Sequence, residues 1–130
     1  MTQDHDKHSG GCHCGAVSFH FQAPSAQTLL LCNCSICEMA GYQHVNILQK
    51  DVQISGQDNL TLYTFGSHQA QHLFCKTCGI KPLYIPRSHP DHYSINLRCV
   101  TSGTITITDT VHFDGQHWEA NVAKIKDPTS

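Results

Sequence analysis

The chain has 130 residues, with 8 lysines and arginines against 10 aspartates and glutamates, and a formal net charge of −2. This length suits one domain with a hydrophobic core, and a hydrophobic content of 39% argues against a disordered chain. Because the chain has no basic excess or Lys/Arg cluster, nucleic acid is not expected as a partner. No stretch reaches the ~20 apolar residues of a membrane helix, so a membrane is not expected either.

The N-terminal sequence MTQDHDKHSGG lacks the apolar core of a secretory signal, so we expect a cytoplasmic location. We predict a polar tail over residues 1–8, in which His5 and His8 are solvated. A single domain is predicted over residues 9–125, followed by a C-terminal tail over residues 126–130. The sequence contains no feature that predicts an oligomeric state.

Short segments rich in β-branched and aromatic residues follow one another along the chain and predict a mainly β fold. The segment AVSFHFQ, for example, alternates apolar and polar residues as a half-buried strand does. Glycines and prolines separate the segments. The predicted strands are 16–22, 44–48, 60–65, 72–74, 83–85, 93–100 and 104–113. Only HWEANVAKI, residues 117–125, is predicted to form a short helix.

Eight cysteines occur at short, repeated spacings: Cys12, Cys14, Cys32, Cys34, Cys37, Cys75, Cys78 and Cys99. Without an export signal, disulfides are not expected. Cysteines one or two residues apart make poor disulfides but have the usual spacing of metal ligands. Gly15 and Gly79 each follow such a pair, and we predict positive φ there, so that backbone N–H groups can face the sulfurs.

One grouping divides seven cysteines into two clusters. Two distant pairs would form a closed four-cysteine cluster: Cys12, Cys14, Cys75 and Cys78. Three neighbouring residues in CNCSIC would form a three-cysteine cluster: Cys32, Cys34 and Cys37. Structural zinc has four protein ligands, whereas catalytic zinc has three and an exchangeable position. This grouping therefore predicts one structural and one open metal site.

Two other groupings stay open at this point. Cys34 and Cys37 could join Cys75 and Cys78 in a ribbon-like site, with the remaining four cysteines in another. Alternatively, Cys99 could close the three-cysteine cluster, which would make both metals structural. If Cys99 is not a ligand, it is predicted to be a buried thiol on a strand.

The segments GGCHCGAVSF, CNCSIC, AQHLFCKTCGIKPLYIPRSHP and INLRCV resemble the glutathione-dependent formaldehyde-activating enzyme family, in particular its centromere protein V branch. The resemblance spans roughly residues 8–120. It implies a small zinc-stapled domain of short coiled β-sheets, similar to the β-tent fold. It also implies two Zn²⁺ ions per chain, a structural one on the four-cysteine cluster and a catalytic one on the three-cysteine cluster.

The resemblance implies a carbon–sulfur lyase that joins glutathione and formaldehyde into S-(hydroxymethyl)glutathione. Three thiolates make Zn²⁺ electron-rich, which suits the binding of a substrate thiol as a thiolate. That thiolate is the nucleophile that adds to an aldehyde carbon. A related enzyme with another thiol or electrophile is a second hypothesis. The third is a non-catalytic zinc module that binds a partner, as the centromere protein V likeness allows.

Further candidates surround the three-cysteine cluster in the sequence. Glu38 is the nearest carboxylate, and His72, three residues before Cys75, is a second candidate for proton transfer. Tyr42 and His44 follow the cluster and are candidates to line a substrate pocket. For both histidines, a core residue in a predicted strand is the alternative interpretation.

Glutathione, the expected small thiol substrate, carries two carboxylates and one ammonium group, so a cationic contact is expected. Arg87 and Arg98 lie in the family-like segments PRS and NLRC and are the candidates for that contact. The alternative for each is a surface or structural arginine.

Overall fold

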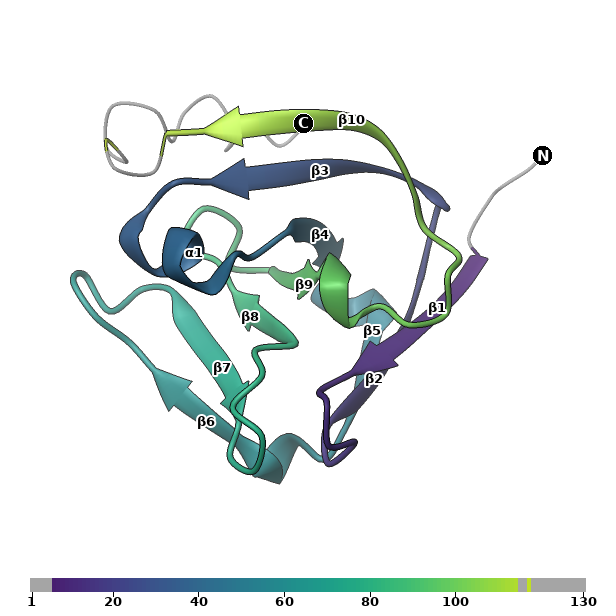
Figure 1. Ribbon diagram of the computed structural model, residues 1–130, viewed down its shortest axis with the longest axis horizontal. Coiled ribbons are helices and arrows are strands. Elements are labelled where there is room, and N and C mark those ends of the chain that lie inside the picture. Colours follow the sequence, from purple (N-terminus) through teal and green to yellow (C-terminus); the bar gives the residue numbers. More distant parts are fainter. Residues whose placement is uncertain (1–5, 115–116, 118–130) are drawn as a thin grey trace.

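The computed structural model describes residues 6–114 and 117, and these residues form two β-sheets with little helix (Figure 1). The strands are β1 Asp6–Gly11, β2 Ser18–Ala23, β3 Ala26–Cys32, β4 His44–Leu48, β5 Val52–Ser55, β6 Leu60–Tyr63, β7 Gln71–Cys75, β8 Leu83–Ile85, β9 His92–Asn96 and β10 Thr106–Phe113. The helical elements are α1 Ser35–Ala40 and the 3₁₀ turns η1 Gln49–Asp51, η2 Gln57–Asn59 and η3 Leu97–Cys99. The mainly β prediction is confirmed.

The smaller sheet has the strand order β1-β2-β5, and the larger has the order β10-β3-β4-β9-β8-β7-β6. All described pairings are antiparallel except β10 with β3, which run parallel along the top of Figure 1. A single bridge between Gly10 and Val100 links β1 to the segment after η3. This bridge ties the end of β1 to a segment about 90 residues later in the chain.

The hydrophobic core lies between the smaller sheet and the central strands of the larger one. Side chains on one face of each strand meet there: Phe19, Phe21, Ala23, Val45, Ile47, Val52, Leu83, Ile95 and Cys99. In β2, alternate residues are buried and exposed, as expected for a strand with one face against a core. Burial of one large apolar side chain contributes ~2 kcal/mol, so these contacts hold the sheets together.

The opposite face of the larger sheet is polar and aromatic. Val45 and Ile47 point into the core, so His44 and Asn46 of the same strand point to the other side. The cross-strand register continues this face from Asn46 to Ser94, from Ser94 to Tyr84, and from Tyr84 to His72. Helix α1 and strand β3 lie beside this polar face in Figure 1.

Several elements differ from the sequence prediction. The strands β1, β3 and β5 were not predicted, and the segment predicted as one strand over 93–100 is β9 followed by η3. The prediction of a solvated His8 is wrong, since this residue of β1 is only 1% exposed. Its ring bonds the carbonyl oxygen of Ala23 at 2.9 Å and the hydroxyl of Thr104 at 2.6 Å.

β1 thus begins within the range predicted as a tail. The predicted helix over 117–125 lies, apart from residue 117, outside the described residues. Over the part of the chain that is described, no helix has the length and apolar character that crossing a membrane requires.

Candidate metal centres and the adjoining cavity

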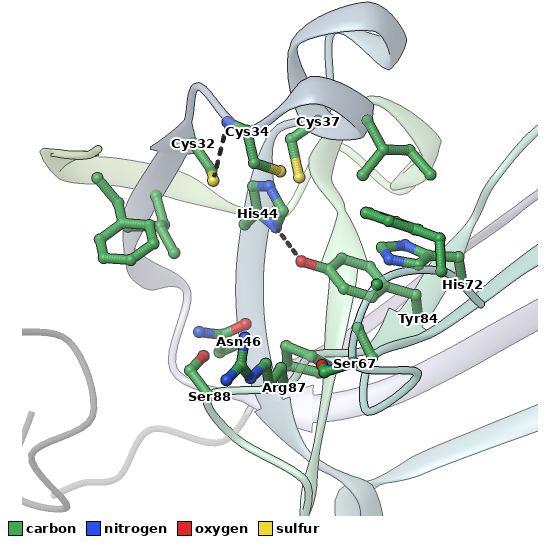
Figure 2. A pocket seen from close by; sticks show the side chains of 17 residues that line it. Cys32, Cys34, Cys37, His44, Asn46, Ser67, His72, Tyr84, Arg87 and Ser88 are labelled. Atoms are coloured by element: carbon green, nitrogen blue, oxygen red, sulfur yellow. Dashed lines mark hydrogen bonds between the residues drawn. The ribbon is translucent and has the colours of Figure 1, made fainter. Parts of the chain in front are cut away.

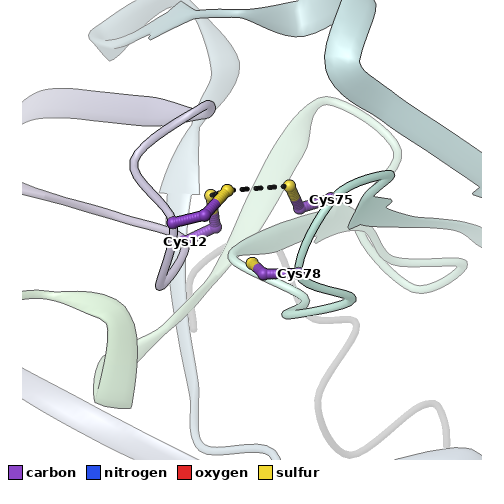
Figure 3. Close-up of side chains that lie close together, drawn as sticks. Cys12, Cys75 and Cys78 are labelled. Carbon is purple, nitrogen blue, oxygen red and sulfur yellow. Dashed lines mark hydrogen bonds between the residues drawn. The ribbon is translucent and has the colours of Figure 1, made fainter.

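The four-cysteine cluster joins two turns that are far apart in the sequence. Cys12 and Cys14 follow β1, Cys75 ends β7 and Cys78 lies in the next turn; Figure 3 shows Cys12 facing the latter two. The four sulfurs lie within 4.8 Å of one another. Sγ of Cys14 is 3.7 Å from that of Cys12 and 3.6 Å from that of Cys75. Tetrahedral Zn²⁺ with Zn–S bonds of ~2.3 Å needs ~3.8 Å between sulfurs, so this cluster fits zinc.

Nitrogen donors face the sulfurs of this cluster. The backbone N–H of Val17 donates to Sγ of Cys12 at 3.3 Å, and that of Thr77 donates to Sγ of Cys75 at 3.4 Å. The side-chain amide of Asn59 also donates to Cys75 Sγ at 3.3 Å. Backbone N–H donors lower the pKa of the Cys75 thiol to about 6. These donors favour the thiolate form that a metal requires.

The glycines that follow the two cysteine pairs have the predicted conformation. Gly15 has φ of 84° and Gly79 has φ of 77°, values that glycine adopts without the steric penalty of a Cβ. The turn at Gly79 is closed by its N–H, which donates to the carbonyl of Cys75 at 2.9 Å. Both glycines therefore serve the local geometry of the metal-binding turns.

The three-cysteine cluster lies where β3 passes into α1. Cys32 ends β3, Cys34 precedes the first helical residue, and Cys37 lies one helical turn further on. Residues three apart in a helix share a face, so Cys34 and Cys37 can turn their sulfurs to the same point. The three sulfurs lie within 4.8 Å of one another, and no fourth His, Cys, Asp or Glu of the described residues joins the group.

The thiols of this cluster interact with one another and with the backbone. Hydrogen bonds from Cys32 and Cys37 hold the pKa of the Cys34 thiol far below its usual value. The backbone N–H of Cys34 donates to Sγ of Cys32 at 3.5 Å. Gly41 caps the C-terminal end of the helix, and its φ of 62° allows its N–H to reach the carbonyls of Cys37 and Glu38. The ligand spacing thus fits a metal with three protein sulfurs.

The structure groups the cysteines as the first of the three predictions does, with two distant pairs in a four-cysteine cluster and the CNCSIC residues in a three-cysteine cluster. None of the eight cysteines forms a disulfide. Cys99 belongs to neither cluster; it is buried in the main core, and burial raises the pKa of its thiol to about 11. Within the described residues, the ribbon-like grouping of Cys34 and Cys37 with Cys75 and Cys78 does not form. The assignment of structural and catalytic roles to the two clusters remains a prediction.

A cavity of about 220 Å³ opens beside the three-cysteine cluster (Figure 2). We refer to it as the cysteine cavity. Its apolar lining comes from Leu30, Ile36, Phe65, Ala70, Pro86 and Phe113. Its polar lining comes from Cys32, Cys34, Cys37, His44, Asn46, Ser67, His72, Tyr84, Arg87 and Ser88. An apolar cavity with a few converging polar groups is the usual form of a small-molecule site.

Two buried histidines line this cavity. His44 is 2% exposed, and its Nδ1 lies 2.8 Å from Ser94 Oγ and 3.2 Å from the hydroxyl of Tyr84. Burial, and then the nearby Lys81 ammonium, lower the pKa of His44 to about 3. The same two causes lower the pKa of His72 to about 4. Both rings are therefore neutral at pH 7.

Lys81 is a residue that the sequence analysis did not identify. Its Nζ lies 4.0 Å from the centre of the Tyr84 ring and 4.8 Å from that of Tyr42. Burial lowers the pKa of Lys81 to about 8, while the thiolates of Cys37 and Cys34 act in the opposite direction. A lysine three residues after Cys78 has no recognisable ligand spacing, so only the fold reveals its position beside the cluster.

The other sequence candidates occupy different places. Arg87 lines the cysteine cavity, and its Nε donates to Gln69 Oε1 at 2.8 Å. Tyr42 is buried and donates to the carbonyl of Ser94 at 2.6 Å; together with the exposed Glu38 it lines a neighbouring cavity instead. Arg98 is exposed on η3 and does not line the cysteine cavity. The fold therefore brings His44, His72 and Arg87 together around the three cysteines.

Comparison with known proteins relates this chain to a protein family and to a solved structure. The model of the glutathione-dependent formaldehyde-activating enzyme family matches residues 7–121. A Rhodobacter sphaeroides protein, whose crystal structure was determined in a structural genomics programme, shares 34% sequence identity with this chain. The two structures superpose with a TM-score of 0.66. That match covers 77% of this chain and 99% of the other. The chain belongs to the glutathione-dependent formaldehyde-activating enzyme family.

Proposed function

We propose that this protein is a carbon–sulfur lyase that forms and cleaves the adduct of a small thiol with formaldehyde or a related electrophile. Glutathione is the proposed thiol. The observation that carries the proposal is the three-cysteine cluster, which opens into a cavity and has no fourth ligand group among the described residues. Such a donor set leaves room for one exchangeable ligand. The family membership supports the same reaction class.

The residues around the cluster suit a thiol substrate. A bound Zn²⁺ would supply Lewis-acid stabilisation that keeps a substrate sulfur as a thiolate at neutral pH. Leu30, Phe65 and Phe113 contribute apolar walls to the cavity. The ammonium of Lys81 places a positive charge near the cysteine thiolates. The positive charge of Lys81 and the apolar walls together favour a thiolate bound in the cavity.

The reaction balances without a redox partner. The thiol R–SH releases its proton, and the sulfur electron pair forms a bond to the aldehyde carbon. The C=O π electrons move to the oxygen, which takes up one proton to give R–S–CH₂–OH in the case of formaldehyde. The reverse sequence breaks the C–S bond. His72 lines the cavity, whereas Glu38 does not, so His72 is the better placed of the two candidates for proton transfer.

The size of the cavity limits what it can hold. Its volume of about 220 Å³ is below the ~300 Å³ at which typical small-molecule pockets begin. We therefore place the sulfur and the aldehyde carbon of the adduct inside, with the rest of the tripeptide extending past the rim. Arg87 provides a guanidinium that can pair with a carboxylate of glutathione.

The test combines metal analysis with zinc-edge X-ray absorption. The purified protein is expected to hold two zinc ions bound by the seven clustered cysteine sulfurs, and glutathione should add one further sulfur ligand. A Cys34→Ser variant should lose that response, while Cys99→Ala, which alters a cysteine outside both clusters, should keep it. Two zinc ions already in complete sulfur shells and indifferent to glutathione would overturn the lyase proposal and favour the non-catalytic module.

A further inference from the structure

Two buried side-chain atoms among the described residues lack a hydrogen-bond partner, Nε2 of His44 and Oδ1 of Asn46. Both residues line the cysteine cavity from β4. An unpaired buried polar atom destabilises the fold, so such an atom in a cavity points to a bound molecule that completes its hydrogen bonding. In Figure 2, His44 lies next to the three sulfurs, whereas Asn46 lies at the other end near Arg87 and Ser88.

The position of the proton on His44 follows from its neighbours. The Tyr84 hydroxyl is buried, which raises its pKa well above the usual value and keeps it protonated. Of the described residues, only His44 offers it a hydrogen-bond acceptor, at Nδ1. When Tyr84 donates to Nδ1, the Ser94 hydroxyl, 2.8 Å from the same nitrogen, also donates to it, and the single proton of the neutral ring is on Nε2. His44 therefore presents an unused N–H donor.

This donor faces the reacting end of the cavity. In Figure 2, the bond to Tyr84 leaves the lower edge of the His44 ring, and the opposite edge faces the sulfurs of Cys34 and Cys37. Nε2 donates to none of these sulfurs, and neither ring nitrogen of His44 belongs to the group of ligand atoms within 4.8 Å of one another. His44 is thus close to the cluster without being one of its ligands.

We propose that Nε2–H of His44 donates a hydrogen bond to the oxygen of the aldehyde substrate and of its thiol adduct. When the thiolate adds to the carbonyl carbon, negative charge develops on this oxygen, and a fixed donor in a buried site stabilises it. Tyr84 and Ser94 act as positioning residues, since their bonds to Nδ1 hold the ring. This inference rests on the proposed lyase reaction and adds the group that recognises the electrophile.

The first test is NMR of the zinc-loaded protein with ¹⁵N-labelled histidine. We expect the His44 ring to be protonated on Nε2, with a signal that changes on addition of glutathione and changes further when formaldehyde is added. His20, an exposed residue bonded to Gln53, provides an internal control, and formaldehyde without glutathione is the control for direct modification. A proton on Nδ1, or no further change with formaldehyde, would overturn the inference.

The second test compares two variants of His44. His44→Leu removes the donor and should lower kcat about 100-fold, as loss of an oxyanion donor does in other enzymes. His44→Gln keeps an N–H donor and should recover part of the rate. Both should bind glutathione like the parent protein, since the sulfur ligands are unchanged. A kcat of His44→Leu within threefold of the parent value would contradict the role of His44.

The outcomes for the two proposals are distinguishable. If the parent protein does not accelerate adduct formation but its His44 signal still responds to glutathione with formaldehyde, the lyase proposal fails. The proposed hydrogen bond from His44 to the adduct oxygen then stands as a binding contact. If the parent protein is active and His44→Leu is equally active, the lyase proposal stands and the inference for His44 fails. If His44→Leu does not fold, the NMR experiment on the parent protein decides.

Discussion

Nζ of Lys81 lies 2.6 Å from Nδ1 of His72. An ammonium group can only donate hydrogen bonds, so Nδ1 accepts this bond and the neutral ring carries its proton on Nε2. The ring of His72 stacks between Phe65 and Tyr84, with centre-to-centre distances of 5.5 and 4.8 Å. This contact fixes the histidine in the wall of the cysteine cavity and places a half-buried cation beside it.

Replacement of Lys81 by methionine tests the role of that cation. Lys81→Met keeps the length of the side chain but removes its charge, so the thiolate of a bound substrate loses a nearby positive charge. We expect glutathione to bind about tenfold more weakly, which corresponds to ~1.4 kcal/mol. Calorimetric titration of the zinc-loaded protein measures the change. Lys50→Met, at an exposed position away from the cavity, is the control; equal affinities of both variants would contradict the role of Lys81.

Lys81→Met should also change how the free energy of unfolding depends on pH. The pKa of Lys81 is lowered to about 8 in the folded protein, below the usual value of 10.5. Between these values the unfolded chain binds more protons, so the free energy of unfolding rises with pH from about 8 to about 10.5. Urea unfolding at several pH values should show this rise in the parent protein and a smaller rise in Lys81→Met. Identical pH profiles would contradict it.

His72 predicts a second pH dependence, at acidic pH. Its pKa of about 4 in the folded protein lies below the unfolded value of 6.5, so the unfolded chain binds more protons between these values. The free energy of unfolding should therefore fall as the pH is lowered from 6.5 to about 4. In His72→Phe the free energy of unfolding should fall less steeply with decreasing pH, because the proton that His72 takes up on unfolding no longer contributes to the slope. Because zinc release on acidification affects both proteins, the difference between the two slopes isolates the histidine.

The two cysteine clusters should differ in their effect on stability. Cys75→Ser and Cys34→Ser should each reduce the zinc content from two ions per chain to one. The four-cysteine cluster ties turns about 60 residues apart, whereas the three-cysteine cluster lies within six consecutive residues. Loss of the first should lower the melting temperature more, because closing the longer loop restricts the unfolded chain more and structural zinc contributes on the order of 10 kcal/mol in small peptides. Elemental analysis and thermal unfolding measure both effects, with Cys99→Ala as the control; equal losses of stability would contradict the assignment.

Substitutions of Arg87 and Arg98 form a matched test and control for substrate binding. Arg87 lines the cysteine cavity and Arg98 does not, although both were candidates from the sequence. Arg87→Gln should raise the KM for glutathione about tenfold through loss of a charge-assisted hydrogen bond, with little change in kcat. Arg98→Gln should have a smaller effect. Steady-state kinetics at fixed formaldehyde concentration provide the measurement, and a larger KM increase for Arg98→Gln would reverse the assignment.

Two glycines allow a test of the close backbone approach between the turns next to β2 and β5 of the smaller sheet. Gly56 has φ of 83°, and a Cβ there would lie only 2.0 Å from the carbonyl oxygen of Ala16. Gly66 has φ of 60° and open space around it. Gly66→Ala should cost ~1 kcal/mol of stability, the penalty for a left-handed residue with a side chain. Gly56→Ala should cost at least ~2 kcal/mol more, as measured by urea unfolding, because backbone atoms must also move.

The strand pattern of the fold could be read from the sequence where a strand has one apolar face. The segments 44–48 and 83–85 were predicted with the bounds that β4 and β8 have in the structure. β1 is different, because its sequence DKHSGG is polar and its strand conformation comes from pairing with β2. β3 likewise depends on its parallel pairing with β10, which lies about 80 residues away in the sequence. Local propensity cannot report such pairings.

The sequence by itself determined the cysteine pairs and the compact CNCSIC motif, since ligand spacing is a local property of the chain. Only the tertiary structure decided that the two distant pairs join in one four-cysteine cluster and that Cys99 joins neither cluster. The three-cysteine cluster needs only the β3–α1 junction, and glycines after the other two pairs shape their turns. The residues around the cavity depend on the tertiary structure alone. Cross-strand register places Ser94, Tyr84 and His72 in one row, and the fold brings Lys81 against that row. Register between strands is set by packing of the whole sheet against its core, so no short segment contains that information.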